Sequence, residues 1–222
     1  MDSPLLEALE ALEADLASGP ADLEDWEARL TALELKAGEA QPRLWALRAK
    51  GHLLAGDAPA ALTGFERALQ LDPTVIPWQI NAASVRLVLG DAAGARTVLR
   101  PLAVAAAQEP TPSWAVTVWN NLARAELELG QHEEALMALE AVLRLAEDPG
   151  RLDPWLALVE DWQQAGQPEL AERMLQLVRQ FGSEAQRQRW LPALANQLLA
   201  QGRAEEAATL YGELLWPSAS TS

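Results

Sequence analysis

Two histidines and two pairs of adjacent glutamates are the side chains of this 222-residue chain best suited to acid-base chemistry. His52 and His132 are the only histidines, and no aspartate or glutamate is spaced to act together with either of them. The chain also has no glycine-rich phosphate loop, no HExxH motif, no serine nucleophile elbow and no cysteine for a thiolate zinc site. Acids after predicted turns favour a helix start through its dipole, and two pairs fit that role: Glu133-Glu134 and Glu205-Glu206. We therefore expect no enzyme activity, no metal site and no cofactor.

A second group of polar side chains is suited to recognition rather than catalysis. It consists of three amides and a guanidinium: Asn81, Asn120, Asn121 and Arg124. Such groups can hold the backbone and the carboxylates of an extended peptide, because they combine hydrogen-bond donors with acceptors or positive charge. They predict a peptide-binding surface on the elements that carry them.

Composition argues against several partner classes. The chain has 32 acidic and 17 basic residues, a net charge of -15 and a pI of about 4.5, so it should repel phosphate backbones. Most of the acidic excess lies in residues 1–41, which hold 11 acids and 2 bases. No apolar run approaches the roughly 18 residues that a membrane-spanning helix requires, and the first residues lack the basic start of a secretory signal. We expect a cytoplasmic protein with no nucleic-acid partner and no membrane span.

Regularly spaced glycines divide most of the chain into repeats. The five glycines are separated by 34, 40, 36 and 36 residues: Gly56, Gly90, Gly130, Gly166 and Gly202. A period near 34 residues with two helices per repeat indicates a solenoid, and solenoids usually provide binding surfaces rather than active sites.

The segment from Pro42 to Pro73 predicts a helix, a tight turn and a second, antiparallel helix. Gly56-Asp57 separates the two helices, because glycine accepts the turn conformation and aspartate caps the helix that follows. Pro73 ends the second helix, since proline cannot continue a helix interior. Residues four and three apart form one packing stripe on each helix: Trp45, Ala49 and His52, then Ala61, Phe65 and Ala68.

This order of an aromatic residue, a small residue, a turn glycine, alanine, a second aromatic residue and a closing proline resembles the tetratricopeptide repeat family. The pattern returns in four further segments: Ala83, Gly90, Ala95 and Leu99; Trp119, Leu122, Ala123, Gly130 and Ala135; Trp155, Leu158, Gly166 and Ala171; and Leu194, Ala195, Gly202, Ala207 and Tyr211. The resemblance implies an all-α, right-handed α-α superhelix of five helix-pair repeats. We predict these repeats at 42–75, 76–109, 116–149, 152–185 and 188–216.

The remaining segments depart from the repeat pattern. Residues 1–41 predict two helices, at about 4–17 and 20–37, which form an acidic N-terminal cap or a degenerate repeat. In the fourth repeat, Val159 replaces a small residue and should spread its helix pair slightly. In the fifth repeat, Pro192 should kink or restart the first helix. We expect an exposed apolar C-terminal end that includes Leu210 and Leu214, followed by a disordered tail at 217–222.

In the tetratricopeptide family, the stripe of each first helix that faces away from the packing stripe lines a concave groove. The candidate groove residues in this chain are Lys50, Leu53, Asn81, Ser84, Leu87, Asn120, Asn121, Arg124, Leu127, Glu160, Gln163 and Asn196. The alternative is a solvated face without a ligand, and an asparagine beside the aromatic position is common in this family. The carboxylate clamp of chaperone-binding members is not reproduced, since Ala46 stands where that clamp needs a base.

The chain contains nine tryptophans, and the resemblance assigns four of them to the core. Trp45, Trp119 and Trp155 occupy the packing position of the family, and Trp162 lies on the same stripe. Tryptophans outside that position are candidate binding anchors: Trp78, Trp114 and Trp190.

The hypothesis from the sequence is a non-catalytic scaffold, adaptor or assembly factor that binds an extended peptide or helix of another protein in its concave groove. Lys50, Arg124 and the asparagines, set against Glu160 and Asp153, indicate a ligand with charges of both signs. The alternative hypothesis is a self-associating scaffold, including a homodimer, that stacks through its C-terminal repeat.

Overall fold

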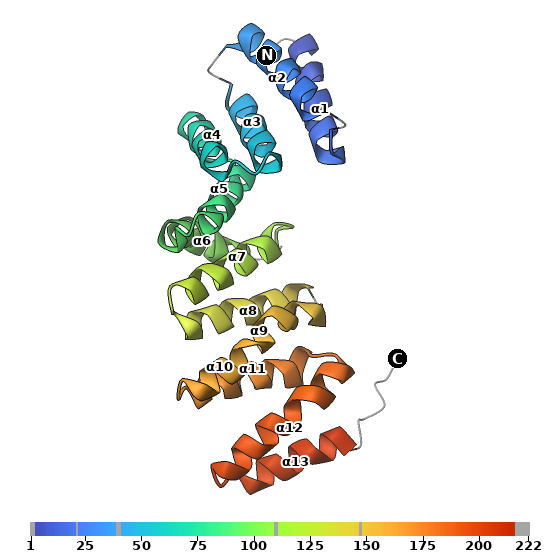
Figure 1. The fold of residues 1–222 in the computed structure, drawn as a ribbon, viewed down its shortest axis with the longest axis vertical. Helices are drawn as coiled ribbons and strands as arrows, with labels where there is room; N and C mark the ends of the chain where they lie inside the picture. The colour runs from blue at the N-terminus through green and yellow to red at the C-terminus, as the bar shows by residue number, and fades with distance from the viewer. Residues whose placement is uncertain (1–2, 21, 39–40, 109–110, 147, 216–222) are drawn as a thin grey trace. The chain divides into compact units, whose positions relative to one another are not determined.

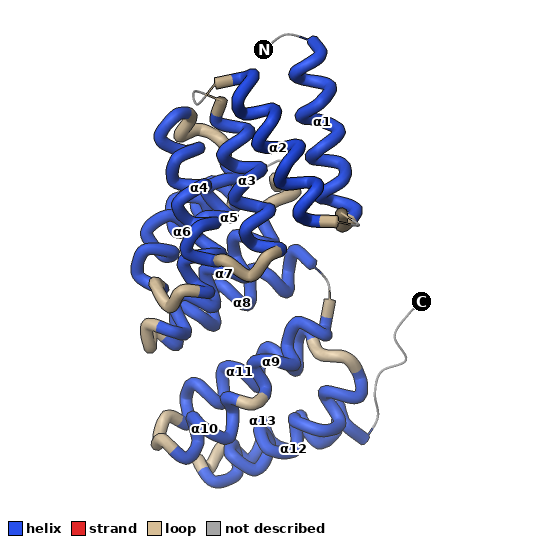
Figure 2. The backbone as a smooth tube through the Cα atoms, turned by 45° about the horizontal axis from the view of Figure 1, so that its top comes forward, coloured by secondary structure: helices blue, strands red, loops and turns tan. Residues whose placement is uncertain are grey.

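The computed structural model describes residues 3–20, 22–38, 41–108, 111–146 and 148–215, and these residues form helices and loops without any strand (Figure 2). The chain divides into two compact units, an N-terminal unit (Met1–Leu129) and a C-terminal unit (Gly130–Ser222). The helices of the N-terminal unit (Figure 1) are α1 (Ser3–Ser18), α2 (Leu23–Ala37), α3 (Pro42–Leu54), α4 (Ala58–Leu71), α5 (Ile76–Val88), α6 (Ala92–Ala106) and α7 (Ala115–Glu128). The C-terminal unit contains α8 (His132–Ala146), the short 3-10 helix η1 (Pro149–Leu152), α9 (Asp153–Leu156), α10 (Leu158–Gln164), α11 (Pro168–Phe181), α12 (Glu184–Ala200) and α13 (Ala204–Leu215).

The turns between paired helices follow from local residue choice. All five predicted turn glycines have a positive φ, between 71° and 78°, which residues with a side chain rarely adopt. The aspartate after the turn then caps the second helix: Asp57 Oδ1 accepts a hydrogen bond from the backbone N–H of Ala60 at 3.0 Å. Asp91 caps α6 in the same way. The predicted turns are therefore confirmed.

Small residues allow α3 and α4 to pack closely, as the sequence predicts. Ala49 and Ala61 are fully buried, and a Cβ added at Gly64 would lie 2.9 Å from the Cβ of Ala49. Trp45 is only half-buried at the edge of this cluster. Trp78, a candidate binding anchor, is instead 9% exposed and packs into the same core, so that prediction is wrong.

The N-terminal helix pair forms a core of its own with α3. The predicted leucine stripe of α1 and the Trp26 stripe of α2 are buried together with Leu44 and Leu47. Trp26 is 1% exposed, and its indole Nε1–H donates to the backbone oxygen of Leu12 at 3.0 Å. Both predicted helices of the segment 1–41 are therefore confirmed, and they cover one side of α3.

The first helix of the fourth repeat differs from its prediction. It is divided into η1, α9 and α10, with a turn at Ala157 between the last two. Pro154 lies in the first turn of α9, where proline is tolerated, and Asp148 caps η1 by accepting from the backbone N–H of Gly150 at 3.0 Å. Val159 is 1% exposed and belongs to the core. The departure that the structure shows at this repeat is thus a divided first helix.

The fifth repeat also begins differently. Its first helix, α12, runs without a break from Glu184 to Ala200, so it starts four residues before the predicted bound of 188 and does not restart at Pro192. A capping box starts it: the Ser183 hydroxyl accepts from the Gln186 backbone, and the Gln186 side chain accepts from the Ser183 backbone. This early start adds one turn to the helix.

One of the two leucines that the sequence predicts to be exposed at the C-terminal end is buried. Leu210 is 1% exposed and Leu214 is half-buried, so the expectation that both are exposed is wrong for Leu210. Leu215 is the exposed leucine of α13, at 68%. The predicted tail at 217–222 lies outside the described residues. Among the helices described, none is long and apolar enough to cross a bilayer.

Candidate functional site

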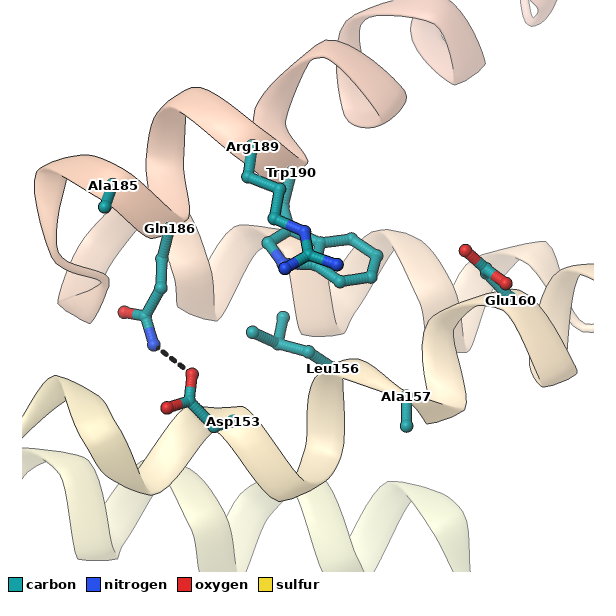
Figure 3. Close-up of a pocket in the computed structure, with 8 residues that line it drawn as sticks. All are labelled: Asp153, Leu156, Ala157, Glu160, Ala185, Gln186, Arg189 and Trp190. Carbon is teal, nitrogen blue, oxygen red and sulfur yellow. Dashed lines mark hydrogen bonds between the residues drawn. The ribbon is translucent and has the colours of Figure 1, made fainter.

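A hollow of about 610 Å³ opens between α9–α10 and α12 in the C-terminal unit (Figure 3). These are the first helices of the fourth and fifth repeats, the helices to which the groove was assigned. The residues that line the hollow are Asp153, Leu156, Ala157, Glu160, Ala185, Gln186, Arg189 and Trp190.

The floor of the hollow is apolar. Leu156 is 5% exposed and Trp190 is half-buried, and Figure 3 shows the indole facing Leu156 across the hollow. Ala157 and Ala185 are small and exposed, so their side chains leave room on both helices. The floor can therefore take up an apolar side chain from solvent.

The rim of the hollow is polar and carries charges of both signs. Gln186 Nε2 donates to Asp153 Oδ1 at 2.6 Å and to the backbone oxygen of Pro149 at 3.1 Å, which ties α12 to η1 and α9. The Arg189 guanidinium lies over the Trp190 ring, 5.3 Å from its centroid, in a cation–π contact. Glu160 is exposed and forms no ion pair within the described residues.

A second polar group lies on α5 and α7 in the N-terminal unit. Asn121 Nδ2 donates to Ser84 Oγ at 2.7 Å, and Ser84 Oγ in turn donates to the backbone oxygen of Ile80. Arg124 Nε donates to Glu128 Oε1 at 2.8 Å. The structure thus joins predicted site residues of two neighbouring first helices, although part of their hydrogen-bonding capacity is used within the protein.

The structure places the predicted groove residues at different depths. Leu87 is 2% exposed and offers no surface to a ligand, whereas Asn196 is exposed and its Oδ1 accepts from the Tyr211 hydroxyl at 2.9 Å. The half-buried residues are Asn81, Ser84, Asn121 and Leu127. The exposed residues are Lys50, Leu53, Asn120, Arg124, Glu160, Gln163 and Asn196.

The hollow includes residues that the sequence analysis assigned to no binding surface, among them Ala157, Ala185, Gln186 and Arg189. Three of them lie in the extra turn of α12 or directly after it. The sequence Ser183-Glu-Ala-Gln186 is a capping-box signal that locates this helix start. Trp190 was a candidate anchor and lines the hollow, while Trp162 is buried and contacts His132 edge to face at 5.7 Å.

Among the described residues of these two surfaces, no set of side chains is arranged for acid-base catalysis or for binding a metal ion. In the described ranges, no group of three or more histidine, aspartate or glutamate side chains could hold a metal ion. His52 is half-buried on α3. The polar residues of both surfaces carry hydrogen-bond donors and acceptors.

Comparison with known proteins gives a family match for one of the repeats. A model of the tetratricopeptide repeat matches residues 116–149, the bounds predicted for the third repeat. The third repeat therefore matches the tetratricopeptide repeat family. No curated protein sequence matches this chain.

Solved structures show the same fold at low sequence identity. MamA (41-end) from Desulfovibrio magneticus RS-1 is 17% identical, with a TM-score of 0.63 over 82% of this chain and 96% of that one. PilF of Pseudomonas aeruginosa is 17% identical, with a TM-score of 0.58 over 97% and 93%. PilW, described as a widely conserved type IV pilus biogenesis factor, is 16% identical, with a TM-score of 0.60 over 100% and 96%. The predicted all-α tetratricopeptide-repeat fold is confirmed.

Proposed function

We propose that this tetratricopeptide-repeat protein is a non-catalytic scaffold or assembly factor that binds an extended peptide or a helix of another protein on its first helices. The observation that carries this proposal is the hollow between α9–α10 and α12, which combines an apolar floor with a charged rim. Protein interfaces have this composition, with apolar contacts at the centre and polar contacts around them.

The size and residue types of the hollow fit a side chain of a partner. A cavity of about 610 Å³ exceeds the volume of one large side chain, so it can also admit part of the partner backbone. Tryptophan is enriched among residues that contribute most to binding, and Trp190 keeps part of its ring exposed at the floor. Gln186 and Arg189 provide donors at the rim.

The first helices of the N-terminal unit support the same function. Lys50, Asn120 and Arg124 are exposed on α3 and α7, where they can contact the backbone and the acidic groups of a peptide. Solenoid proteins generally bind partners through extended surfaces built from successive repeats. One similar structure is that of a pilus biogenesis factor, and we propose a role in assembly for this chain as well.

The test is crosslinked capture of partners from native lysate with tagged full-length protein and two variants. Trp190→Ala removes the ring at the hollow, and Lys50→Glu/Arg124→Glu reverses charge on the first helices of the N-terminal unit. The matched control is Lys36→Glu/Arg67→Glu, which makes the same charge change at exposed positions of α2 and α4. Partners that the wild type and the control capture, and that either test variant loses, support the proposal. Partners retained by both test variants refute binding on the first helices.

Self-association is the alternative function, and the exposed Leu215 at the end of α13 favours it. It predicts that the tagged protein recovers chiefly its own untagged copy. Light scattering would then give twice the mass of the chain, and Leu215→Lys would restore the mass of a monomer. A monomer at high protein concentration would exclude this alternative.

A further inference from the structure

We infer that the hollow selects a basic partner segment, in which a large apolar side chain stands beside a lysine or arginine. The inference rests on the proposed peptide binding and specifies its ligand. Three observations in the C-terminal unit support it: the acids left without a basic partner, their position around the apolar floor, and the engagement of Arg189 with Trp190.

Ion pairs in the C-terminal unit occupy most of its arginines but leave the acids of α9–α10 unpaired. The paired arginines are Arg144 with Glu140, Arg151 with Asp148, Arg173 with Glu133, Arg179 with Glu213, and Arg203 with Glu172 and Glu206. Asp153, Glu160 and Asp161 have no basic partner in the described part of this unit. Their negative charge is therefore available to a bound cation.

Two of these acids flank the apolar floor. Figure 3 shows Asp153 and Glu160 towards opposite ends of the hollow, with Leu156 between them. Asp153 accepts from Gln186, whereas Glu160 has no hydrogen-bond partner in the described residues. An apolar side chain seated on Leu156 and Trp190 would place the neighbouring residues of its segment near these carboxylates. A lysine or arginine at such a neighbouring position can reach a carboxylate because its side chain is long.

The basic residue at the hollow does not cancel this negative charge. Arg189 stacks on Trp190 at 5.3 Å and forms no ion pair with an acid of the described residues. The lining thus carries two carboxylates and one guanidinium, within a chain of net charge -15. An acidic segment would meet repulsion from Asp153 and Glu160, and a basic one would be attracted at long range as well as at contact.

The experiment selects ligands without assuming a partner. A display library of random 12-residue peptides is panned against the full-length protein, and the enriched peptides are sequenced. The most enriched peptide is synthesised with a fluorescent label. Its affinity is measured by fluorescence anisotropy for the wild type, Trp190→Ala, and Asp153→Asn/Glu160→Gln. The control Glu134→Gln/Glu205→Gln removes two exposed acids of the same unit that lie away from the hollow and form no ion pair with the described residues.

The expected result is enrichment of peptides with lysine or arginine next to a large apolar residue. Trp190→Ala should weaken binding of the selected peptide by about fivefold or more, as expected for an anchor residue. Asp153→Asn/Glu160→Gln should weaken binding of this peptide by about threefold to tenfold, the range expected for the loss of two exposed charge pairs. The control should stay within about twofold. Because Trp190 is half-buried, Ala185→Arg serves as a second variant that fills the hollow from an exposed helical position, and it should also weaken binding.

Different results overturn different parts of the inference. Enriched peptides that are acidic or uncharged, and that Trp190→Ala or Ala185→Arg weakens, would overturn the basic preference while supporting peptide binding at the hollow. Equal weakening by the acid variant and its control would show non-specific attraction by net charge and overturn the assignment of these carboxylates. No enriched peptide at all would count against the proposed function itself.

Discussion

A single methyl group added at Gly51 tests how the N-terminal helix pair packs on α3. Gly51 lies inside α3, and a Cβ built on it would lie 2.6 Å from Cζ3 and 3.1 Å from Cη2 of Trp26. Carbon atoms do not approach this closely, so either the ring or the helix must move. The ring has little freedom, because Trp26 is 1% exposed and its indole N–H is bonded to the Leu12 backbone oxygen.

The free energy of unfolding should fall by about 1–2 kcal/mol in Gly51→Ala. Two effects oppose each other: alanine stabilises a helix interior by about 1 kcal/mol relative to glycine, and an extra methyl group in a packed core costs about 1–3 kcal/mol. The rigid ring places the steric cost in the upper part of that range. Gly212→Ala is the matched control, since a Cβ there has no atom within 4 Å in α13. That variant should be more stable than wild type by about 0.5–1 kcal/mol.

Urea unfolding followed by far-UV circular dichroism measures both variants under the same conditions. The contact can be isolated in a double-mutant cycle with Trp26→Phe, which removes the ring carbons nearest to Gly51. In that background, Gly51→Ala should become neutral or stabilising. If Gly51→Ala stabilises the otherwise wild-type chain as Gly212→Ala does, Trp26 does not pack against α3 as described.

Three further perturbations test other parts of the fold. Glu126→Gln should lower the free energy of unfolding by about 1.5–3 kcal/mol in urea titrations, because Glu126 is 1% exposed and its carboxylate is paired with Arg100 at 2.9 Å. Arg203 lowers the pKa of Glu206 from its ordinary value of 4.5, first by a side-chain hydrogen bond, so the stability that this contact provides is complete above pH 4.5 and is lost as pH falls through the lowered pKa. The difference in urea midpoint between wild type and Arg203→Met should therefore be larger at pH 7 than at pH 3. Ser183→Ala should cost about 1 kcal/mol in thermal or urea unfolding, since it removes the cap of α12.

Each of these perturbations has a control or a contrary result. For Glu126→Gln the control is Glu128→Gln on the same helix, whose exposed pair with Arg124 should contribute less than about 1 kcal/mol. A midpoint difference for Arg203→Met that does not change with pH would contradict the lowered pKa. Unchanged stability of Ser183→Ala would show that α12 does not need its capping box.

The repeats could be predicted from the sequence because their signals are local. A turn glycine, an aspartate cap and a closing proline each act within a few residues of the chain, and the bounds predicted for the third repeat are those that the family model matches. The two helices of residues 1–41 were predicted from leucine and tryptophan spacing, and that spacing follows from the helical period. The start of α12 also has a local signal in the sequence, the capping box at Ser183.

The candidate site could be predicted only in part. Glu160 and Trp190 were named from position and residue type, and both line the hollow. Trp78 and Leu87 were named by the same reasoning and are buried, since their exposure depends on neighbouring helices. Ala185 and Gln186 also line the hollow, but they precede residue 188, where repeat periodicity placed the start of the fifth repeat.

The sequence by itself determined the helical class, the turn positions and the repeat period of this protein, because backbone preference and side-chain spacing act along the chain. The tertiary structure alone decided which stripes of those helices are covered. It divided the first helix of the fourth repeat. It also placed Leu156 of that repeat opposite Trp190 of the fifth repeat, 34 residues further along the chain. Such a hollow exists only when helices distant in sequence lie near one another, and their placement depends on the shapes of all the side chains between them.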